Sequence, residues 1–241
     1  MTIRNEVKMA TYVMSDIHGN YEKYIQALKA IKLQNSDTLY VLGDVVDRGQ
    51  GSCKILLDMM CHFNIIPLLG NHEFMAMTVL SKLVEEITEE SLISFGQDFI
   101  TGMLSWFENG GDVTLKEFKQ LSLDDRQAVL EYLEEFELYA EITVNNQDYV
   151  LVHAGLENFK KTKRLSDYKL SEIIWAETDY DKVYFKDKIL ITGHKPVSAI
   201  LFDKSADKIL KQNNHIAIDC GCGFNRNLAV LCLDTMEEMY F

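Results

Sequence analysis

Short apolar runs alternate with helix-like stretches along the first third of the chain. Residues 11–14, 39–42 and 65–69 form apolar runs of strand length. Between them, apolar residues recur at three- and four-residue spacing over 21–31 and again over 52–60, which is typical of amphipathic helices. Strands that alternate with helices in this way predict a parallel α/β sheet.

The middle of the chain has a different pattern. Helical spacing extends over residues 74–137 and is interrupted by the turn Asn109-Gly110-Gly111. Thr114 and Ser122 then stand where N-caps of two shorter helices are expected. We interpret 74–137 as a helical insertion without a catalytic candidate of its own.

Strand patterns return after the insertion. Residues 138–144 and 149–152 predict a hairpin, and 188–192 predicts a further strand. Shorter strands are expected at 199–202, 209–210, 215–218, 228–233 and 238–241. Since no Pro-rich, Gly/Ser-rich or repeated stretch marks a linker, residues 1–241 are expected to form a single domain.

Composition narrows the function classes. A net charge of −13 argues against nucleic acid as a partner, because backbone binding needs clustered Lys and Arg. Five cysteines at irregular spacing indicate reduced thiols, mostly buried, rather than a disulfide framework. Residues 1–8 lack an apolar signal core and no apolar run is long enough to span a bilayer, so we expect a cytoplasmic protein without a membrane partner.

Polar side chains that bind metals follow several of the predicted strands directly. Parallel strands gather such groups in the crevice at their carboxyl ends. The residues are Asp16, His18, Asp44, Asn71, His153 and His194.

This set of two carboxylates, one amide and three imidazoles suits Mn, Fe or Zn better than Ca or Mg. Six ligands are too many for one tetrahedral ion but fit two ions. Two-metal hydrolytic sites hold their ions about 3.5–4 Å apart and activate a bridging water, which requires a shared carboxylate. Asp44 is the central candidate for that role. His62 and His215 follow no such pattern and are expected to be ordinary histidines.

Three further residues beside these ligands could complete a hydrolytic site. His72 could protonate a leaving group, because imidazole titrates near neutrality. Asp47 could accept a hydrogen bond from the other ring nitrogen, and the planar fork of Arg48 suits phosphate oxygens. Alternatively, Asp47 and Arg48 could simply pair with each other.

Five sequence blocks together resemble the calcineurin-like metallophosphoesterases, and more narrowly the bacterial and phage branch of the phosphoprotein phosphatase superfamily. The resemblance extends from residue 11 to about residue 233. The blocks are Ser15-Asp16-Ile17-His18-Gly19-Asn20, Gly43-Asp44-Val45-Val46-Asp47-Arg48-Gly49, Gly70-Asn71-His72-Glu73, Val152-His153-Ala154-Gly155 and Gly193-His194.

The resemblance implies an α/β fold: a two-sheet mixed β-sandwich flanked by helices. It also implies two divalent ions, with Mn favoured and Fe or Zn as alternatives. One ion would be held by Asp16, His18 and Asp44. The implied ligands of the second ion are Asp44, Asn71, His153 and His194. His72 would be the acid, paired with Asp47, while Arg48, Asn71 and His72 would contact the substrate phosphate.

The chain departs from that branch at one position. Bacterial relatives usually carry an arginine shortly after a tryptophan, ahead of the last histidine block. Here Glu177 stands near that position, after Trp175. The second phosphate clamp is therefore absent or replaced by Lys195 or Arg164.

The expected activity is that of a protein serine/threonine phosphatase, with phosphotyrosine as an open second substrate. Its partner would be a phosphorylated protein or a small phosphoester. The alternatives are a symmetrical dinucleoside tetraphosphate hydrolase, whose family shares these blocks, and a weakly active metal-bearing binding protein. The acidic composition mildly disfavours the first alternative, because its substrate is highly charged.

Overall fold

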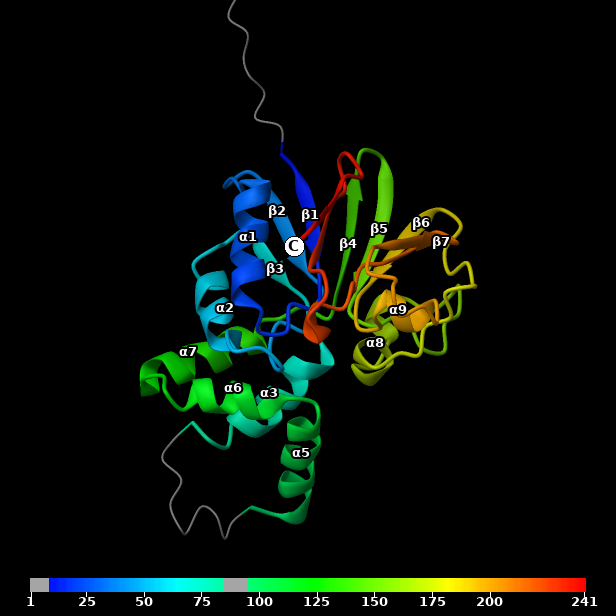
Figure 1. Cartoon of the computed structure of the whole chain (residues 1–241). Coiled ribbons are helices and arrows are strands. Elements are labelled where there is room, and N and C mark those ends of the chain that lie inside the picture. Colours follow the sequence, from blue (N-terminus) through cyan, green and yellow to red (C-terminus); the bar gives the residue numbers. More distant parts are fainter. Residues whose placement is uncertain (1–8, 85–94) are drawn as a thin grey trace, which may run out of the picture.

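The computed structural model describes residues 9–84 and 95–241. The expectation for residues 1–8, and the part of the helical pattern over 85–94, lie outside the described residues. Two mixed five-stranded sheets pack against each other, with helices outside them (Figure 1). This confirms the predicted two-sheet α/β fold.

The first sheet has the order β10-β9-β1-β2-β3, in which β1, β2 and β3 are parallel. The second has the order β4-β5-β6-β8-β7, with β5, β6 and β8 parallel. The strands are β1 Thr11–Met14, β2 Thr38–Val41, β3 Ile65–Pro67, β4 Tyr139–Val144, β5 Gln147–Val152, β6 Lys188–Thr192, β7 Leu210–Gln212, β8 His215–Ala217, β9 Ala229–Cys232 and β10 Glu238–Tyr240.

The helices lie outside the sheets and at one end of the molecule (Figure 1). α1 and α2 flank the first sheet, α8 and α9 lie beside the second, and α3 with α5–α7 forms the helical end. Their bounds are α1 Tyr21–Ile31, α2 Ser52–Met59, α3 Asn71–Leu80, α5 Gln97–Glu108, α6 Gly111–Phe118, α7 Leu123–Glu134, α8 Ser171–Ile174 and α9 Val197–Ile200. None of the helices in the described ranges has both the length and the apolar character needed to cross a bilayer.

Alternation along the strands divides the core into layers. Successive side chains of a strand point to opposite faces. In β1, Val13 packs between the sheets, while Met14 packs into the core under the helices. In β5, Leu151 faces the first sheet and Val152 faces the α8 side. Because both faces of these strands are buried, their sequences are apolar runs rather than alternating patterns.

Most predicted elements are confirmed to within a few residues, but the strand expected at 199–202 is wrong. The one-turn helix α9 begins after Pro196, and the Leu201 backbone N–H donates to the Val197 carbonyl. Leu201 and Phe202 project outward, with 46% and 96% of their surface exposed. The four-residue apolar run has no periodicity that distinguishes a strand from a helical turn, and Pro196 suits a helix start.

The predicted insertion is helical where it is described. α3 is followed by α5, α6 and α7, with a turn at 109–111 between α5 and α6. Ser122 caps α7 as predicted, accepting a hydrogen bond from the Asp125 backbone N–H at 3.1 Å. The N-cap role expected for Thr114 is wrong, because α6 begins at Gly111 and Thr114 lies buried inside it.

Candidate metal centre

The carboxyl ends of five parallel strands meet at one edge of the two sheets. The turns after β1, β2, β3, β5 and β6 carry the predicted site residues. Several of these turns have strained backbone, since Asp16, His18, Asp44 and His194 have φ values of 54°, 47°, 53° and 67°. Such conformations cost of the order of 1–3 kcal/mol each and concentrate at functional sites.

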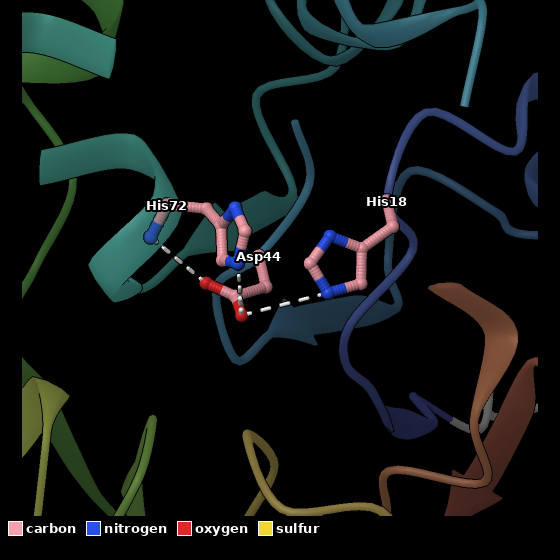
Figure 2. Close-up of side chains that lie close together, drawn as sticks. All are labelled: His18, Asp44 and His72. Carbon is pink, nitrogen blue, oxygen red and sulfur yellow. Dashed lines mark hydrogen bonds and ion pairs between the residues drawn. The ribbon is translucent and has the colours of Figure 1, made fainter. Parts of the chain in front are cut away.

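Asp44 lies at the centre of this edge and belongs to two triads of potential ligand atoms. One consists of His18, Asp44 and His72, and the other of Asp44, His153 and His194. Figure 2 shows Asp44 between His18 and His72. Asp44 Oδ2 is 3.6 Å from His18 Nε2, whereas Oδ1 is 3.3 Å from His153 Nε2. Its two oxygens therefore face different imidazoles, an arrangement that allows one carboxylate to contact two ions.

Backbone carbonyls set the orientation of two of these histidines. His18 Nδ1 lies 3.0 Å from the Val46 carbonyl, and His153 Nδ1 lies 2.6 Å from the Leu42 carbonyl. Donation from each Nδ1–H leaves the Nε2 lone pair directed at Asp44. A ligand histidine in a metal site is usually held by its other ring nitrogen in this way.

Asn71 is located between the second pair of histidines. Its Oδ1 lies 2.9 Å from His153 Nε2 and 2.9 Å from His194 Nδ1. Because His153 Nδ1 donates to the Leu42 carbonyl, its Nε2 carries a lone pair. That lone pair faces two oxygens, Asn71 Oδ1 and Asp44 Oδ1. A cation among them would satisfy all of these acceptors, so the donor set fits a metal ion.

The electrostatics of the cluster agree with that fit. Burial lowers the pKa of His18 to about 3 and that of His194 to about 4, so both imidazoles are neutral ligands at pH 7. Burial alone would raise the pKa of Asp44, but the surrounding imidazoles outweigh it and lower it. Asp44 is therefore ionised and can bind cations.

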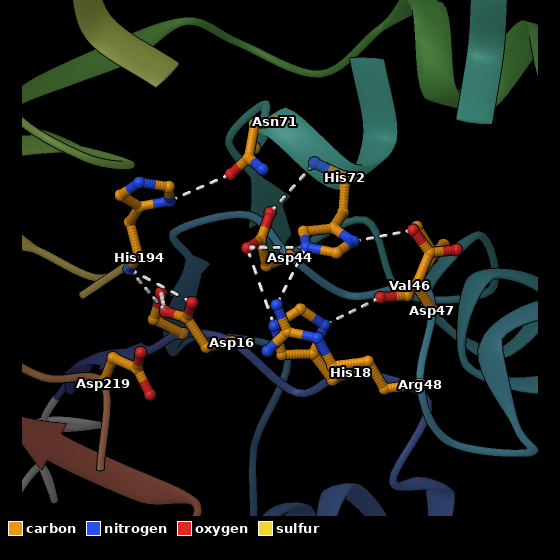
Figure 3. Close-up of polar contacts among 12 residues, drawn as sticks. Asp16, His18, Asp44, Val46, Asp47, Arg48, Asn71, His72, His194 and Asp219 are labelled. Atoms are coloured by element: carbon orange, nitrogen blue, oxygen red, sulfur yellow. Dashed lines mark hydrogen bonds and ion pairs between the residues drawn. The ribbon is translucent and has the colours of Figure 1, made fainter. Parts of the chain in front are cut away.

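Asp16 joins the site without belonging to either triad. Its carboxylate oxygens accept hydrogen bonds from the His194 backbone N–H at 3.1 and 3.0 Å (Figure 3). Asp219 at the end of β8 also lies nearby, and burial together with Asp219 and Asp44 raises the pKa of Asp16 well above its usual range. The Gly221 backbone N–H donates to Asp219 Oδ1 at 2.8 Å, which is typical of a tight turn.

Glu73 has a supporting role that the sequence analysis did not assign. Its buried carboxylate accepts hydrogen bonds from four backbone N–H groups around the β2 and β3 turns. Oε2 accepts from Asp44 at 2.8 Å and Gly70 at 3.0 Å, and Oε1 accepts from Val45 at 2.7 Å and Val46 at 3.1 Å. α3 thus holds in place the strained turn that presents Asp44.

His72 and Asp47 form the predicted pair. His72 Nδ1 is 2.7 Å from Asp47 Oδ2, and both side chains are buried. Burial alone would lower the pKa of His72, but the Asp44 and Asp47 carboxylates outweigh it and raise it. The alternative in which Asp47 pairs with Arg48 does not fit, because the Arg48 guanidinium Nη2 lies 3.1 Å from His72 Nε2 (Figure 3).

The Arg48 guanidinium is held from two directions. Its Cζ lies 4.6 Å from the centre of the Phe224 ring, a cation–π contact. Its backbone N–H donates to the Gly110 carbonyl at 3.0 Å. Gly110 has φ 93°, and a Cβ there would lie 2.9 Å from Arg48 Cγ, so this turn needs glycine.

Neither substitute for the second phosphate clamp is a free cation in the structure. Lys195 Nζ lies 3.7 Å from a carboxylate oxygen of Glu177, the residue at the expected arginine position, in an exposed ion pair. Arg164 pairs with Asp167 at 2.9 Å and its side chain is 79% exposed. His62 and His215 belong to neither triad, and all five cysteines are free, with Cys61 exposed and the others buried.

The helical insertion contributes two supporting side chains to the site, neither of which was assigned a role there from the sequence. Trp106 and Thr114 both donate hydrogen bonds to the Asp47 carboxylate. The turn at 109–111 was recognised from its glycines, but the helical periodicity of its flanks carried no indication that these two side chains point at Asp47.

Comparisons with known proteins agree with this geometry. The model of the family described as calcineurin-like phosphoesterase matches residues 9–221. The symmetrical bis(5'-nucleosyl)-tetraphosphatase of Salmonella paratyphi A is 37% identical over 75 residues. That match spans 30% of this chain and 27% of the relative, so it covers about a quarter of the relative's length.

Two solved structures share the fold. One, assigned provisionally as a diadenosine tetraphosphatase, has a TM-score of 0.64 at 15% identity, over 98% of this chain and 94% of that one. The other is a protein serine/threonine phosphatase from Saccharomyces cerevisiae, with a TM-score of 0.59 at 14% identity, over 95% of this chain and 74% of that one. Fold, cluster and family match together lead to one conclusion: the chain belongs to the calcineurin-like phosphoesterase family.

Proposed function

We propose that the chain hydrolyses phosphomonoesters with two divalent metal ions, and that its substrates are phosphoserine and phosphothreonine in proteins. The observation that carries this proposal is the position of Asp44. It is shared by two ligand triads, and the pair His72–Asp47 and the Arg48 guanidinium lie directly beside it.

The shared position of Asp44 supports an assignment of ligands to two ions. Asp16, His18 and Asp44 are proposed to hold one ion, and Asp44, Asn71, His153 and His194 the other. Manganese is our first choice, with iron or zinc as alternatives, because the donors are oxygen and imidazole nitrogen. Bound there, divalent ions supply positive charge to the phosphoryl oxygens and make a nearby water more acidic.

The protein's own groups have distinct tasks in the reaction. Arg48 is placed to bind two phosphoryl oxygens through its planar fork. As it turns from His72 towards phosphate, His72 Nε2 becomes free to carry a proton. Water adds to phosphorus while the bond to the leaving oxygen breaks, and that oxygen takes the proton from His72. One proton of the water stays on the product phosphate, and the other is released and restores the proton of His72. Asp47 keeps the ring in the orientation that this transfer needs.

Local charge supports a monoester over a polyphosphate chain. The Arg48 guanidinium contacts His72, and Lys195 is in an ion pair with Glu177. The whole chain carries a net charge of −13. A single dianionic phosphoryl group needs less compensation than a tetraphosphate bridge. The match to symmetrical tetraphosphatases favours dinucleoside tetraphosphate as the second candidate substrate.

A parallel assay tests the proposal. Manganese-loaded protein is given a phosphoserine peptide, a phosphotyrosine peptide and diadenosine tetraphosphate at equal concentrations. We expect phosphate release from the phosphoserine peptide to be fastest. Nucleoside diphosphate release from the dinucleotide at a far higher rate would select the second candidate. No product from any substrate at full metal loading would instead support a weakly active binding protein.

A further inference from the structure

The carboxylate of Asp47 receives hydrogen bonds from three sides. His72 Nδ1 lies 2.7 Å from Oδ2, Trp106 Nε1 donates to the same oxygen at 2.7 Å, and Thr114 Oγ1 donates to Oδ1 at 2.7 Å. Trp106 and Thr114 belong to the helical insertion, 59 and 67 residues away along the chain. Both are essentially buried, as is Asp47.

Thr114 also fixes the backbone from which Asp47 projects. The Asp47 N–H donates to Thr114 Oγ1 at 3.0 Å and lies 3.0 Å from Ser52 Oγ. Asp47 has φ 74°, a left-handed conformation that needs support from its surroundings. The threonine hydroxyl therefore contacts both the backbone N–H of Asp47 and its carboxylate oxygen Oδ1, and it fixes the positions of both.

Trp106 reaches Asp47 because the α5–α6 turn packs closely against its indole. A Cβ at Gly111 would lie 2.2 Å from Trp106 Cε2, so a glycine is needed at this point of the turn. A buried indole N–H needs an acceptor, and here that acceptor is a carboxylate, which makes the bond charge-assisted.

We propose that Trp106 and Thr114 are positioning residues of the acid. They fix the Asp47 carboxylate so that Oδ2 accepts from His72 Nδ1, and His72 Nε2 is left facing the leaving group. A carboxylate held by His72 alone could rotate about its last bond, whereas three donors define a single orientation. The kinetic consequence rests on the proposed function, but the orientation of the His72 ring does not.

The chemistry of the leaving group provides a selective readout. When the phosphorus–oxygen bond breaks, its electron pair goes to the leaving oxygen. An alcohol oxygen, as in phosphoserine, then needs the proton from His72, whereas p-nitrophenolate is stable without it. A misplaced acid therefore slows hydrolysis of the alkyl ester much more than that of the aryl ester, while general damage to the fold slows both equally.

Thr114 allows a matched set of variants. Thr114→Val keeps the shape and removes the hydroxyl, and Thr114→Ser restores it. Trp106→Phe removes the other donor. Thr101→Val is the control, because Thr101 is exposed on α5 and its hydroxyl donates only to the Gln97 carbonyl of its own helix, at 2.9 Å.

We expect Thr114→Val and Trp106→Phe to lower the ratio of kcat/KM for a phosphoserine peptide to that for p-nitrophenyl phosphate by about 10- to 100-fold. This is less than the about 10²- to 10⁴-fold that a general acid contributes, because the acid is misplaced and not removed. Thr114→Ser should return the ratio to within about threefold of the parent protein, and Thr101→Val should leave it unchanged. An equal loss on both substrates, or no rescue by serine, would overturn the positioning role.

A second measurement does not depend on activity. Nitrogen-15 spectra of the imidazole rings in metal-free protein, recorded at a pH high enough that the His72 ring is neutral, report which of its nitrogens carries the proton. His72→Asn is used only for assignment. We expect a single Nδ1–H form in the parent protein and in Thr114→Ser, and a mixture in Thr114→Val and Trp106→Phe. Unchanged spectra in both variants would refute the proposal. A changed spectrum in a protein that hydrolyses no phosphoester would sustain it and refute only the proposed function.

Discussion

Replacing Glu73 by glutamine tests whether α3 holds the Asp44 turn in place. The carboxylate accepts four backbone hydrogen bonds, two on each oxygen. Glutamine keeps one acceptor oxygen and puts an amide group, itself a donor, against two N–H groups. Burial and the neighbouring Asp44 raise the pKa of the Glu73 carboxyl to about 7, so the cost is worked from the N–H groups that lose an acceptor. A buried N–H left without an acceptor costs about 1–3 kcal/mol, so two of them should cost roughly 2–6 kcal/mol of unfolding free energy.

Urea and thermal unfolding of metal-free protein measure this loss without reference to function. For a chain of this size, each kcal/mol lowers Tm by about 2–4 °C, so Glu73→Gln should lower Tm by about 4 °C or more. Glu117→Gln is the matched control. Its half-buried carboxylate accepts a hydrogen bond from the Cys53 backbone N–H through Oε2 at 3.0 Å, which an amide oxygen can keep. A Glu73→Gln protein as stable as the Glu117→Gln protein would refute the role assigned to Glu73.

Three further predictions concern metal, phosphate and pH. Asp44→Asn should lose manganese affinity and activity together, because both triads share this carboxylate; calorimetric titration with Mn²⁺ that still shows two tight sites would contradict it. Arg48→Ala should raise the inhibition constant of inorganic phosphate about 10- to 100-fold, the loss of a charge-assisted hydrogen-bonding fork, while the exposed Arg164→Ala should not change it. His215 has its pKa lowered to about 4 by burial, so the unfolded chain, with a histidine pKa near 6.5, takes up the proton first as pH falls. Stability should therefore drop between pH 7 and pH 5, and His215→Gln should remove about 2 kcal/mol of that drop in urea unfolding; an identical drop in both proteins would argue against a neutral buried His215.

Strand exits could be predicted from the sequence because two independent patterns coincide there. An apolar run of four or five residues marks the strand, and metal-type side chains follow it directly. The sequence therefore placed Asp44, Asn71 and His153 at one sheet edge, and the structure brings their ligand atoms together. By contrast, residues 199–202 had only the apolar run, and this alone did not distinguish a strand from a helical turn.

Contacts made across the fold could not be predicted in the same way. Trp106 and Thr114 lie in the predicted helical insertion, where only a cap role was expected for Thr114. Their partner Asp47 is 59 and 67 residues away along the chain. Glu73 was visible next to His72, but its four acceptor bonds depend on how the β2 and β3 turns approach each other. Hydrophobic periodicity predicts which side of a helix or strand is buried. The hydrogen bonds of Trp106, Thr114 and Glu73 depend instead on which distant turn packs against that side.

Helix α3 links stability to chemistry at this site. Its first residues are Asn71, His72 and Glu73, so one turn of helix presents a candidate ligand, the candidate acid and the support of the Asp44 turn. Strained φ values at Asp44 and Asp47 cost energy that the folded state must offset locally. Glu73, in the first turn of α3, supports the strained backbone of Asp44 by accepting a hydrogen bond from its N–H. Thr114, in the insertion, supports the strained backbone of Asp47 in the same way. A substitution that loosens either support should therefore disturb the geometry of the site before it unfolds the sheets, since the sheets are held by apolar layers that neither residue contributes to.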